Sequence, residues 1–308
     1  MICSVVGNVS ILRWLCSSGH RMRYTQNAMI RRLSLTIVTI LSCSHEPAEP
    51  ELRNGQLDNT HSSAFDVIQQ DAIESGGTES RHKQAPSDPE KRPLALILTE
   101  TQGYYHASIA PAVAALSDIL LDDGFTVQQS ESSSVFMQGL AHVSVLIFLS
   151  TTGDILSNAE QTAVRTYVQA GGGWVGIHAA ADAEYEWPWY EQLVGAWFAG
   201  HPPVQEANIR VNQKHAATSM LPLKWTRTDE WYDFSRPPPS GATVLLWLES
   251  MSDTDGSIRR DHPIAWAQSI GQGRSLYTGG GHTEESYHEP LFREHLLASV
   301  RWAARLEP

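Results

Sequence analysis

Four side chains that could carry proton or metal chemistry lie after or within predicted strands of this chain. They are His106, His178, Glu230 and His282. In an open α/β sheet, the carboxyl ends of the strands border one crevice, and ligands bind in that crevice. An imidazole titrates at a pKa of about 6.5, so it can act as acid, base or metal ligand near neutral pH. We therefore expect these side chains to be neighbours in a candidate site.

Two kinds of chemistry fit such a set, and the residues leave both open. In the first, His178, His282, Glu230 and Glu284 exchange protons with a sugar or an oxidised sugar as general acids and bases. In the second, His178, His201, Glu230 and His282 hold a divalent ion such as Zn²⁺ or Mn²⁺ with one position open for water. The sequence has no HxH or HExxH pair, so ligand spacing does not favour the metal.

Aromatic residues predict what kind of molecule the crevice would bind. Nine of the ten tryptophans lie beyond residue 170, and a tryptophan-rich crevice suits the apolar faces of sugar rings. The expected substrate-binding residues are Tyr105, His106, Asp182, Trp187 and Trp231. A domain that binds carbohydrate without catalysis is the alternative. The remaining histidines and one glutamate are expected to be structural or solvated: His215 and His262 at turns, and His288, Glu294 and His295 on the solvated face of the last helix.

The elements that must position these residues alternate between strands and helices from Pro93 onward. Continuous apolar runs predict buried strands at Leu94–Leu98, Ser144–Leu149 and Trp174–Ile177, with a short one at Phe125–Val127. Helical spacing and capping residues predict helices over Ser108–Leu121 and from Ser157 or Asn158 to Ala170. This order predicts a flavodoxin-like parallel sheet with helices on both faces.

The second half of the chain reads as extra strands followed by a helix. The expected strands are Ala207–Asn212, Trp225–Phe234, Thr243–Leu248, Ile264–Gln268 and Arg274–Thr278. Short helical segments are expected at Pro188–Gly195 and, at the end of the chain, Pro290–Leu306. The glycine runs at 171–173 and 279–281 lack the residues of a phosphate loop, so we expect them to let chain segments approach closely.

Charge and cysteine content exclude several classes of protein. Residues 1–43 hold five of the 22 basic residues and no acidic one, so 17 basic residues face 34 acidic ones in the remainder. A nucleic-acid-binding protein needs a basic face for phosphates, so this balance argues against one. The three cysteines are Cys3, Cys16 and Cys43. The globular part therefore has no thiolate nucleophile and no cysteine ligand for a metal.

The first 92 residues predict an export signal followed by a flexible linker. Arg31 and Arg32 precede the apolar run Leu33–Leu41, and Ser42-Cys43 closes it like a bacterial lipobox. We expect residues 1–43 to be a lipoprotein signal region, with Met29 as the true start and Cys43 as the lipid anchor. Residues 44–92 are too polar to form a core and are expected to be a flexible linker to a domain at 93–308. This predicts an exported, lipid-anchored protein of the cell envelope or periplasm.

Six ordered motifs in residues 93–304 resemble the ThuA-like (trehalose-utilisation) family. They are GYYHASI, GGGWVGIHAAADAEYEWPWY, LVGAWFAGHP, TDEWYDF, DHPIAW and GRSLYTGGGHTEESY. The resemblance implies a fold similar to class I glutamine amidotransferases and a place in bacterial carbohydrate metabolism. That superfamily carries a nucleophilic cysteine at a strand-to-helix turn, with a downstream His-x-Glu. Here the turn holds His178, and His282-Thr283-Glu284 resembles the downstream pair. Because the domain has no cysteine, catalysis through a thioester is excluded.

Overall fold

The computed structural model describes residues 92–252 and 257–307. The expected signal region at 1–43, with its lipid-anchor residue Cys43, lies outside the described residues. So does the expected linker at 44–92 apart from Arg92. Within the described part of the chain, no helix is both long and apolar enough to span a bilayer.

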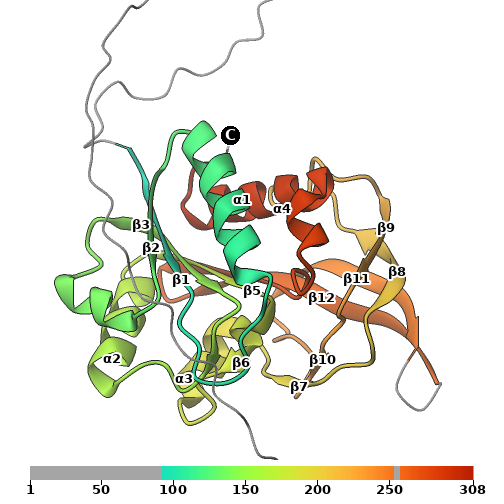
Figure 1. Ribbon diagram of the computed structural model, residues 1–308, viewed down its shortest axis with the longest axis horizontal. Coiled ribbons are helices and arrows are strands. Elements are labelled where there is room, and N and C mark those ends of the chain that lie inside the picture. Colours follow the sequence, from blue (N-terminus) through green and yellow to red (C-terminus); the bar gives the residue numbers. More distant parts are fainter. Residues whose placement is uncertain (1–91, 253–256, 308) are drawn as a thin grey trace, which may run out of the picture. The chain divides into compact units, whose positions relative to one another are not determined.

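Five parallel strands form one half of a nine-stranded sheet (Figure 1). In sheet order they are β2 (Thr126–Ser130), β1 (Leu94–Leu98), β3 (Val143–Leu149), β5 (Gly173–Ile177) and β13 (Gly273–Thr278). The apolar runs of β1, β3 and β5 are buried almost throughout, because helices cover both faces of this half. The predicted parallel core is therefore confirmed.

Four antiparallel strands extend the sheet from β13. In order they are β12 (Ile258–Ile270), β11 (Thr243–Ser252), β8 (Gln205–Val211) and β9 (Lys224–Asp229), which is the edge strand. Two short pairs lie outside the main sheet: β4 (Thr152–Gly153) with β6 (Asp182–Ala183), and β7 (Phe198–Gly200) with β10 (Asp233–Phe234). The extra strands predicted in the second half are present.

Helices cover the two faces of the parallel half, and the sheet lies between two apolar cores. Helices α1 (Ile109–Asp122) and α4 (Pro290–Ala303) lie side by side on one face, and α2 (Asn158–Gln169) and α3 (Pro188–Val194) lie on the other (Figure 1). Short 3₁₀ turns are η2 (Ser133–Gln138), η3 (His178–Ala181) and η4 (Glu285–His288). The predicted cap of α2 is Ser157, which forms a capping box with Glu160.

The segment predicted as one strand over Trp225–Phe234 is interrupted. Strand β9 ends at Asp229, and the chain re-enters a strand only at Asp233. The Asp229 side chain accepts a hydrogen bond from the Glu230 N–H at 2.9 Å, which turns the backbone away from the ladder. This interruption places Glu230 at a strand end.

The prediction that His295 lies on the solvated face of the last helix is wrong. His295 is fully buried, with Nδ1 3.2 Å from the Ala217 carbonyl and Nε2 3.1 Å from Thr278 Oγ1. Three- and four-residue spacing places it on the same face of α4 as Phe292 and Ser299, which are also buried. His288 and Glu294 are exposed, as predicted.

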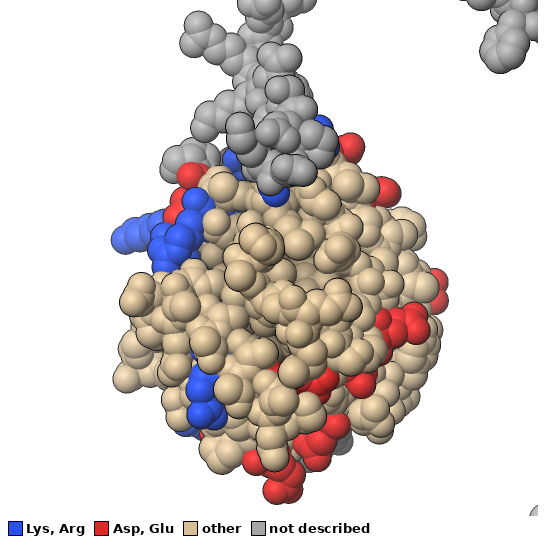
Figure 2. Space-filling model, turned by 90° about the vertical axis from the view of Figure 1, so that its left-hand side faces the viewer, with Lys and Arg blue, Asp and Glu red and all other residues tan. Residues whose placement is uncertain are grey.

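The surface shows an uneven distribution of charge on the face drawn in Figure 2. Lys and Arg side chains gather mainly on the left of the view, and Asp and Glu lie mainly along the right and lower edges. The area between them is largely uncharged.

Candidate functional site

The strand directions bring the predicted site residues to one edge of the sheet. Strands β1, β5 and β13 are parallel, and four antiparallel steps from β13 return β9 to the same direction. The residues that follow these four strands therefore meet. One donor atom from each of His106, His178, Glu230 and His282 lies within 4.8 Å of the other three. The expected neighbourhood is present, and we call these four residues the cluster.

His178 sits at a sharp turn directly after β5. Its φ of 52° lies in the left-handed region, which is costly for a residue with a side chain. Ala179, Ala180 and Ala181 follow in η3 and are fully buried, so only small side chains fit there. Tyr277 donates a hydrogen bond to the His178 carbonyl at 2.9 Å and fixes this turn.

The ring of His178 has a defined tautomer. Its Nδ1 lies 3.0 Å from the Gly279 carbonyl, which can only accept, so Nδ1 carries the proton. Nε2 then presents its lone pair to the cluster. His106 Nε2 lies 3.2 Å from this atom, Tyr232 Oη 3.1 Å and His282 Nδ1 3.3 Å. His178 Nε2 is therefore the centre of the arrangement.

Glu230 connects the buried histidines to an exposed one. Its Oε2 lies 3.2 Å from His282 Nδ1 and 3.6 Å from His178 Nε2. Its Oε1 lies 3.0 Å from Nδ1 of His201, whose side chain is 41% exposed. Burial raises the pKa of Glu230, but the hydrogen bond from His282 and the nearby histidines outweigh it, so the pKa is lowered. Glu230 is thus an anion at neutral pH.

The pKa values of the three imidazoles in the cluster are shifted in different directions. Burial, with the charges of His178 and His282, lowers the pKa of His106 to about 3. Burial also lowers the pKa of His178 to about 4, against the opposing charge of Asp229. The hydrogen bond to Glu230 raises the pKa of His282, against the effect of burial. At neutral pH the cluster therefore combines two neutral imidazoles with a histidine–carboxylate pair.

Several predicted site residues lie outside the cluster. Glu284 is exposed at the start of η4, and the carboxylate beside His282 is Glu230 instead. His201 contacts Glu230 rather than the imidazoles. Tyr105 is exposed, and Asp182 is half-buried and accepts a hydrogen bond from Tyr185 at 2.7 Å.

Trp187 and Trp231 lie in the interior rather than at an exposed surface. Trp187 packs against Trp189 and Tyr190 in the core beneath α3. Trp231 is fully buried and donates its indole N–H to the Gln205 carbonyl at 2.9 Å. Neither ring offers an exposed face to a sugar. His215 and His262 hold nearby backbone, the structural role predicted for them, but His262 lies within β12 and not at a turn. His215 accepts from the Ala217 N–H, and His262 Nε2 lies 2.8 Å from the Tyr232 carbonyl.

Two tyrosines lie next to the cluster, and of these Tyr232 was not predicted from the sequence. Tyr232 has its hydroxyl against His178, and Tyr104 is 65% exposed with its ring edge-on to His106 at 4.7 Å. The signal for Tyr232 was its position two residues after Glu230. That spacing returns a side chain to the same side of an extended segment.

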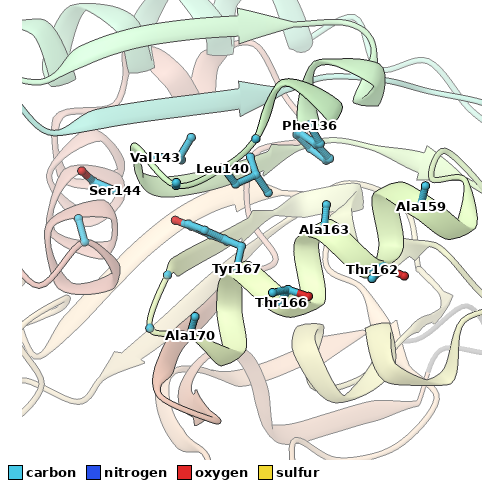
Figure 3. Close-up of a pocket in the computed structure, with 15 residues that line it drawn as sticks. Phe136, Leu140, Val143, Ser144, Ala159, Thr162, Ala163, Thr166, Tyr167 and Ala170 are labelled. Atoms are coloured by element: carbon cyan, nitrogen blue, oxygen red, sulfur yellow. The ribbon is translucent and has the colours of Figure 1, made fainter.

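A hollow elsewhere on the domain does not belong to the cluster. It has a volume of about 740 Å³ and lies between α2 and the segment from η2 to the start of β3 (Figure 3). Tyr167 is the one titratable residue among those that line it, and its hydroxyl donates to the Gly173 carbonyl at 3.0 Å. The lining is otherwise apolar or weakly polar, so the hollow has no groups for acid–base or metal chemistry.

Comparison with known families agrees with the motifs. The family described as ThuA, trehalose utilisation, matches residues 94–303. The chain belongs to the ThuA family. No protein with a curated description matches it.

Solved structures of ThuA-like proteins share this fold. One from Bacteroides uniformis ATCC 8492 is 28% identical with a TM-score of 0.59, covering 71% of this chain and 95% of that one. One from Parabacteroides merdae ATCC 43184 is 22% identical with a TM-score of 0.61, covering 70% and 90%. A β-galactosidase from Bacillus circulans sp. alkalophilus is 14% identical with a TM-score of 0.51, covering 70% of this chain and 32% of that one. At that identity the likeness is one of fold alone.

Proposed function

We propose that this ThuA-family protein is an enzyme that binds a divalent metal ion at His106, His178, Glu230 and His282 and acts on a carbohydrate. The observation that carries the proposal is the convergence of four donor atoms within 4.8 Å in a largely buried site. Three of the donors are imidazole nitrogens and one is a carboxylate oxygen, a donor set that suits Zn²⁺ and Mn²⁺.

The crowding of polar atoms around His178 Nε2 supports the proposal that a cation binds there. A neutral imidazole nitrogen has one lone pair and accepts one good hydrogen bond. Here the imidazoles of His106 and His282 and the hydroxyl of Tyr232 all lie within 3.3 Å of it. Ligands of a tetrahedral zinc ion lie about 3.4 Å from one another, given metal–ligand distances of about 2.1 Å. Four of the six distances among the cluster's donor atoms, 3.2 to 3.6 Å, match that spacing, and the other two are no longer than 4.8 Å.

The protonation states are also those that ligands require. The lowered pKa values of His106 and His178 keep both rings neutral at pH 7, with lone pairs available. Glu230 is ionised, and a metal would compete with the proton that the raised pKa of His282 favours on its ring. A bound ion would supply Lewis-acid chemistry and a water of lowered pKa. His201, which is 41% exposed and lies 3.0 Å from Glu230 Oε1, would connect the site to solvent.

The substrate class rests on the family's description and on aromatic residues near the cluster. Trehalose utilisation names a sugar. Tyr104 and Tyr105 are exposed beside His106, and tyrosine rings suit the apolar faces of sugars. We therefore propose a glycoside or a keto-sugar as substrate, with a hydrolase, lyase or isomerase type of reaction.

The metal content of the purified protein tests the proposal. We expect the full chain, purified without chelator, to hold about one Zn²⁺ or Mn²⁺ per molecule by elemental mass spectrometry. His178→Ala should lose this metal, and His295→Gln, at a buried histidine outside the cluster, should keep it. If the wild-type protein neither contained metal nor bound added Zn²⁺ or Mn²⁺, the metal site would be wrong.

A second candidate is acid–base catalysis without a metal. His282, with its raised pKa, lies 3.3 Å from His178, with its lowered pKa, and such divergent pairs serve as acid and base. Turnover at full rate of a glycoside or keto-sugar by chelator-treated, metal-free protein would select this candidate. Sugar binding without turnover in either form would select a non-catalytic binding domain.

We further propose that the protein is exported to the cell envelope and anchored by a lipid on Cys43. The proposal rests on the apolar run and Ser42-Cys43 ending described above. Labelled palmitate should appear on the wild-type protein and not on Cys43→Ala. Equal labelling of both would contradict the anchor.

A further inference from the structure

A buried ion pair lies beneath the cluster and takes no part in the proposed chemistry. Arg227 and Asp229 alternate with exposed residues along β9, so both point to its buried face. Their side chains are 4% and 0% exposed, and Arg227 Nη1 lies 3.0 Å from Asp229 Oδ2. A buried pair of this kind is retained only when the remaining hydrogen-bonding groups are satisfied.

The Asp229 carboxylate bonds to both segments that carry the Glu230–His282 half of the cluster. Its Oδ1 accepts from the backbone N–H of Glu230 at 2.9 Å and of His282 at 3.0 Å. Its Oδ2 accepts from the N–H of Gly281 at 2.7 Å and from the Ser286 hydroxyl at 3.2 Å. One carboxylate thus joins the end of β9 to the loop after β13.

Arg227 holds the other side of this carboxylate and the start of α4. Its Nε donates to Glu289 at 2.8 Å and its Nη2 donates to Ser286 at 2.7 Å. Its guanidinium lies 4.3 Å from the ring centre of Phe292. The planar group is therefore fixed on several sides, as arginine at buried ion pairs tends to be.

Gly280 shows how closely the loop approaches this pair. A Cβ atom at this position would collide with Arg227 Nη1 and lie 3.1 Å from Asp229 Oδ2. No left-handed backbone requires glycine here, so the requirement is one of space. The loop that carries His282 therefore rests directly on the ion pair.

We propose that Arg227 and Asp229 form a positioning clamp that sets the distance between the metal-binding atoms of Glu230 and His282. The clamp rests on the proposed function, because the spacing it sets is that of two proposed metal ligands, 3.2 Å between Oε2 and Nδ1. Charge-assisted hydrogen bonds to an ionised carboxylate are short and strong, which suits this task. In Asp229→Asn, an NH₂ group replaces one carboxylate oxygen. This group faces N–H and O–H donors and cannot accept their hydrogen bonds.

Two readouts test the clamp, and one of them needs no metal. In metal-free protein, the Gly281 and His282 amides should exchange slowly with deuterium in the wild type and much faster in Asp229→Asn. Where Co²⁺ binds, Asp229→Asn should weaken its affinity about ten- to a hundred-fold, the loss expected when a group that orients a ligand is removed. Visible absorption of the Co²⁺ protein reports that affinity.

Glu184→Gln is the matched control. Glu184 is also a buried carboxylate that accepts backbone hydrogen bonds, from Ile155 and Leu156 at 2.8 Å, but it lies outside the cluster. It should lose thermal stability while its Co²⁺ affinity and the exchange of Gly281 and His282 stay as in the wild type. If Asp229→Asn does not fold, Gly280→Ala and Ser286→Ala disturb the same clamp and should show the same two changes.

The outcomes separate the clamp from the proposed function. Fast exchange at Gly281 and His282 in a wild type that binds no Co²⁺ would overturn both. Slow exchange in a wild type that binds no Co²⁺ would overturn the metal site alone, and exchange in Asp229→Asn would then decide the clamp. A folded Asp229→Asn protein with wild-type exchange, or with wild-type Co²⁺ affinity, would overturn the clamp.

Discussion

At the scale of single residues, the site depends on neighbouring imidazoles that titrate differently. His178 and His106 are buried and keep their lone pairs, because the interior penalises a charged ring. His282 is partly exposed and bonded to Glu230, so its charged form is favoured. The contrast between these pKa values follows from burial and from the Glu230 carboxylate, because all three residues are histidines.

Glu230→Gln should lower the pKa of His282. The substitution keeps an oxygen that can accept a hydrogen bond but removes the negative charge that stabilises the imidazolium. The measurement is an NMR pH titration of the His282 ring in metal-free protein. Glu285→Gln, at an exposed carboxylate in the same segment, is the control and should leave the titration unchanged. An unchanged His282 titration in Glu230→Gln would show that Glu230 does not set this pKa.

At the scale of elements, local patterns predicted the fold well. Apolar runs and capping residues lie close together in sequence, so β1, α2 and β5 were predicted within one residue at each end. The failures came from contacts that sequence spacing does not show. The end of β9 depends on a side-chain bond within Asp229-Glu230, and the burial of His295 depends on partners 17 and 78 residues away.

The candidate site was predictable in part for the same reason. Strand-end positions identified His106, His178 and His282, because parallel strands end at one edge, whereas Glu230 was expected within the strand Trp225–Phe234. The choice of partners was not predictable. The resemblance to a downstream His-x-Glu pattern suggested Glu284 as the carboxylate for His282, but the chain brings Glu230 there from an antiparallel extension of the sheet.

Gly173→Ala should destabilise the domain by about 1–3 kcal/mol, the usual cost of overpacking. A Cβ at this position, the first residue of β5, would collide with the carbonyl group of Ala303 at the end of α4. Because the colliding groups belong to the backbone of β5 and of α4, they cannot shift without a cost in free energy. Gly241→Ala is the control, because nothing lies within 4 Å of its added Cβ. Urea denaturation measures both, and equal stability of the two variants would contradict this close approach.

At the scale of the whole molecule, buried neutral histidines couple folding to pH. His106, His178 and His295 have folded pKa values of about 3, 4 and 4, below the ordinary value of 6.5 expected in the unfolded chain. Above that pH both states are neutral, and the stability is fully present. As the pH falls, these histidines bind protons in the unfolded chain but not in the folded protein, so the free energy of unfolding decreases. The raised pKa of His282 adds stability as the pH falls towards 6.5. Below that value its ring is protonated in both states, so it does not offset the loss at lower pH.

Metal-free protein should therefore lose stability steadily between pH 6.5 and 4, by about 1.4 kcal/mol per pH unit for each buried neutral histidine. His295→Gln removes one such group outside the cluster, so its free energy of unfolding should fall less steeply with decreasing pH, by about that amount. His288→Gln, at an exposed histidine, is the matched control. Urea denaturation at several pH values measures the slopes. A His295→Gln slope equal to that of the wild type would show that His295 accepts its proton in the folded state.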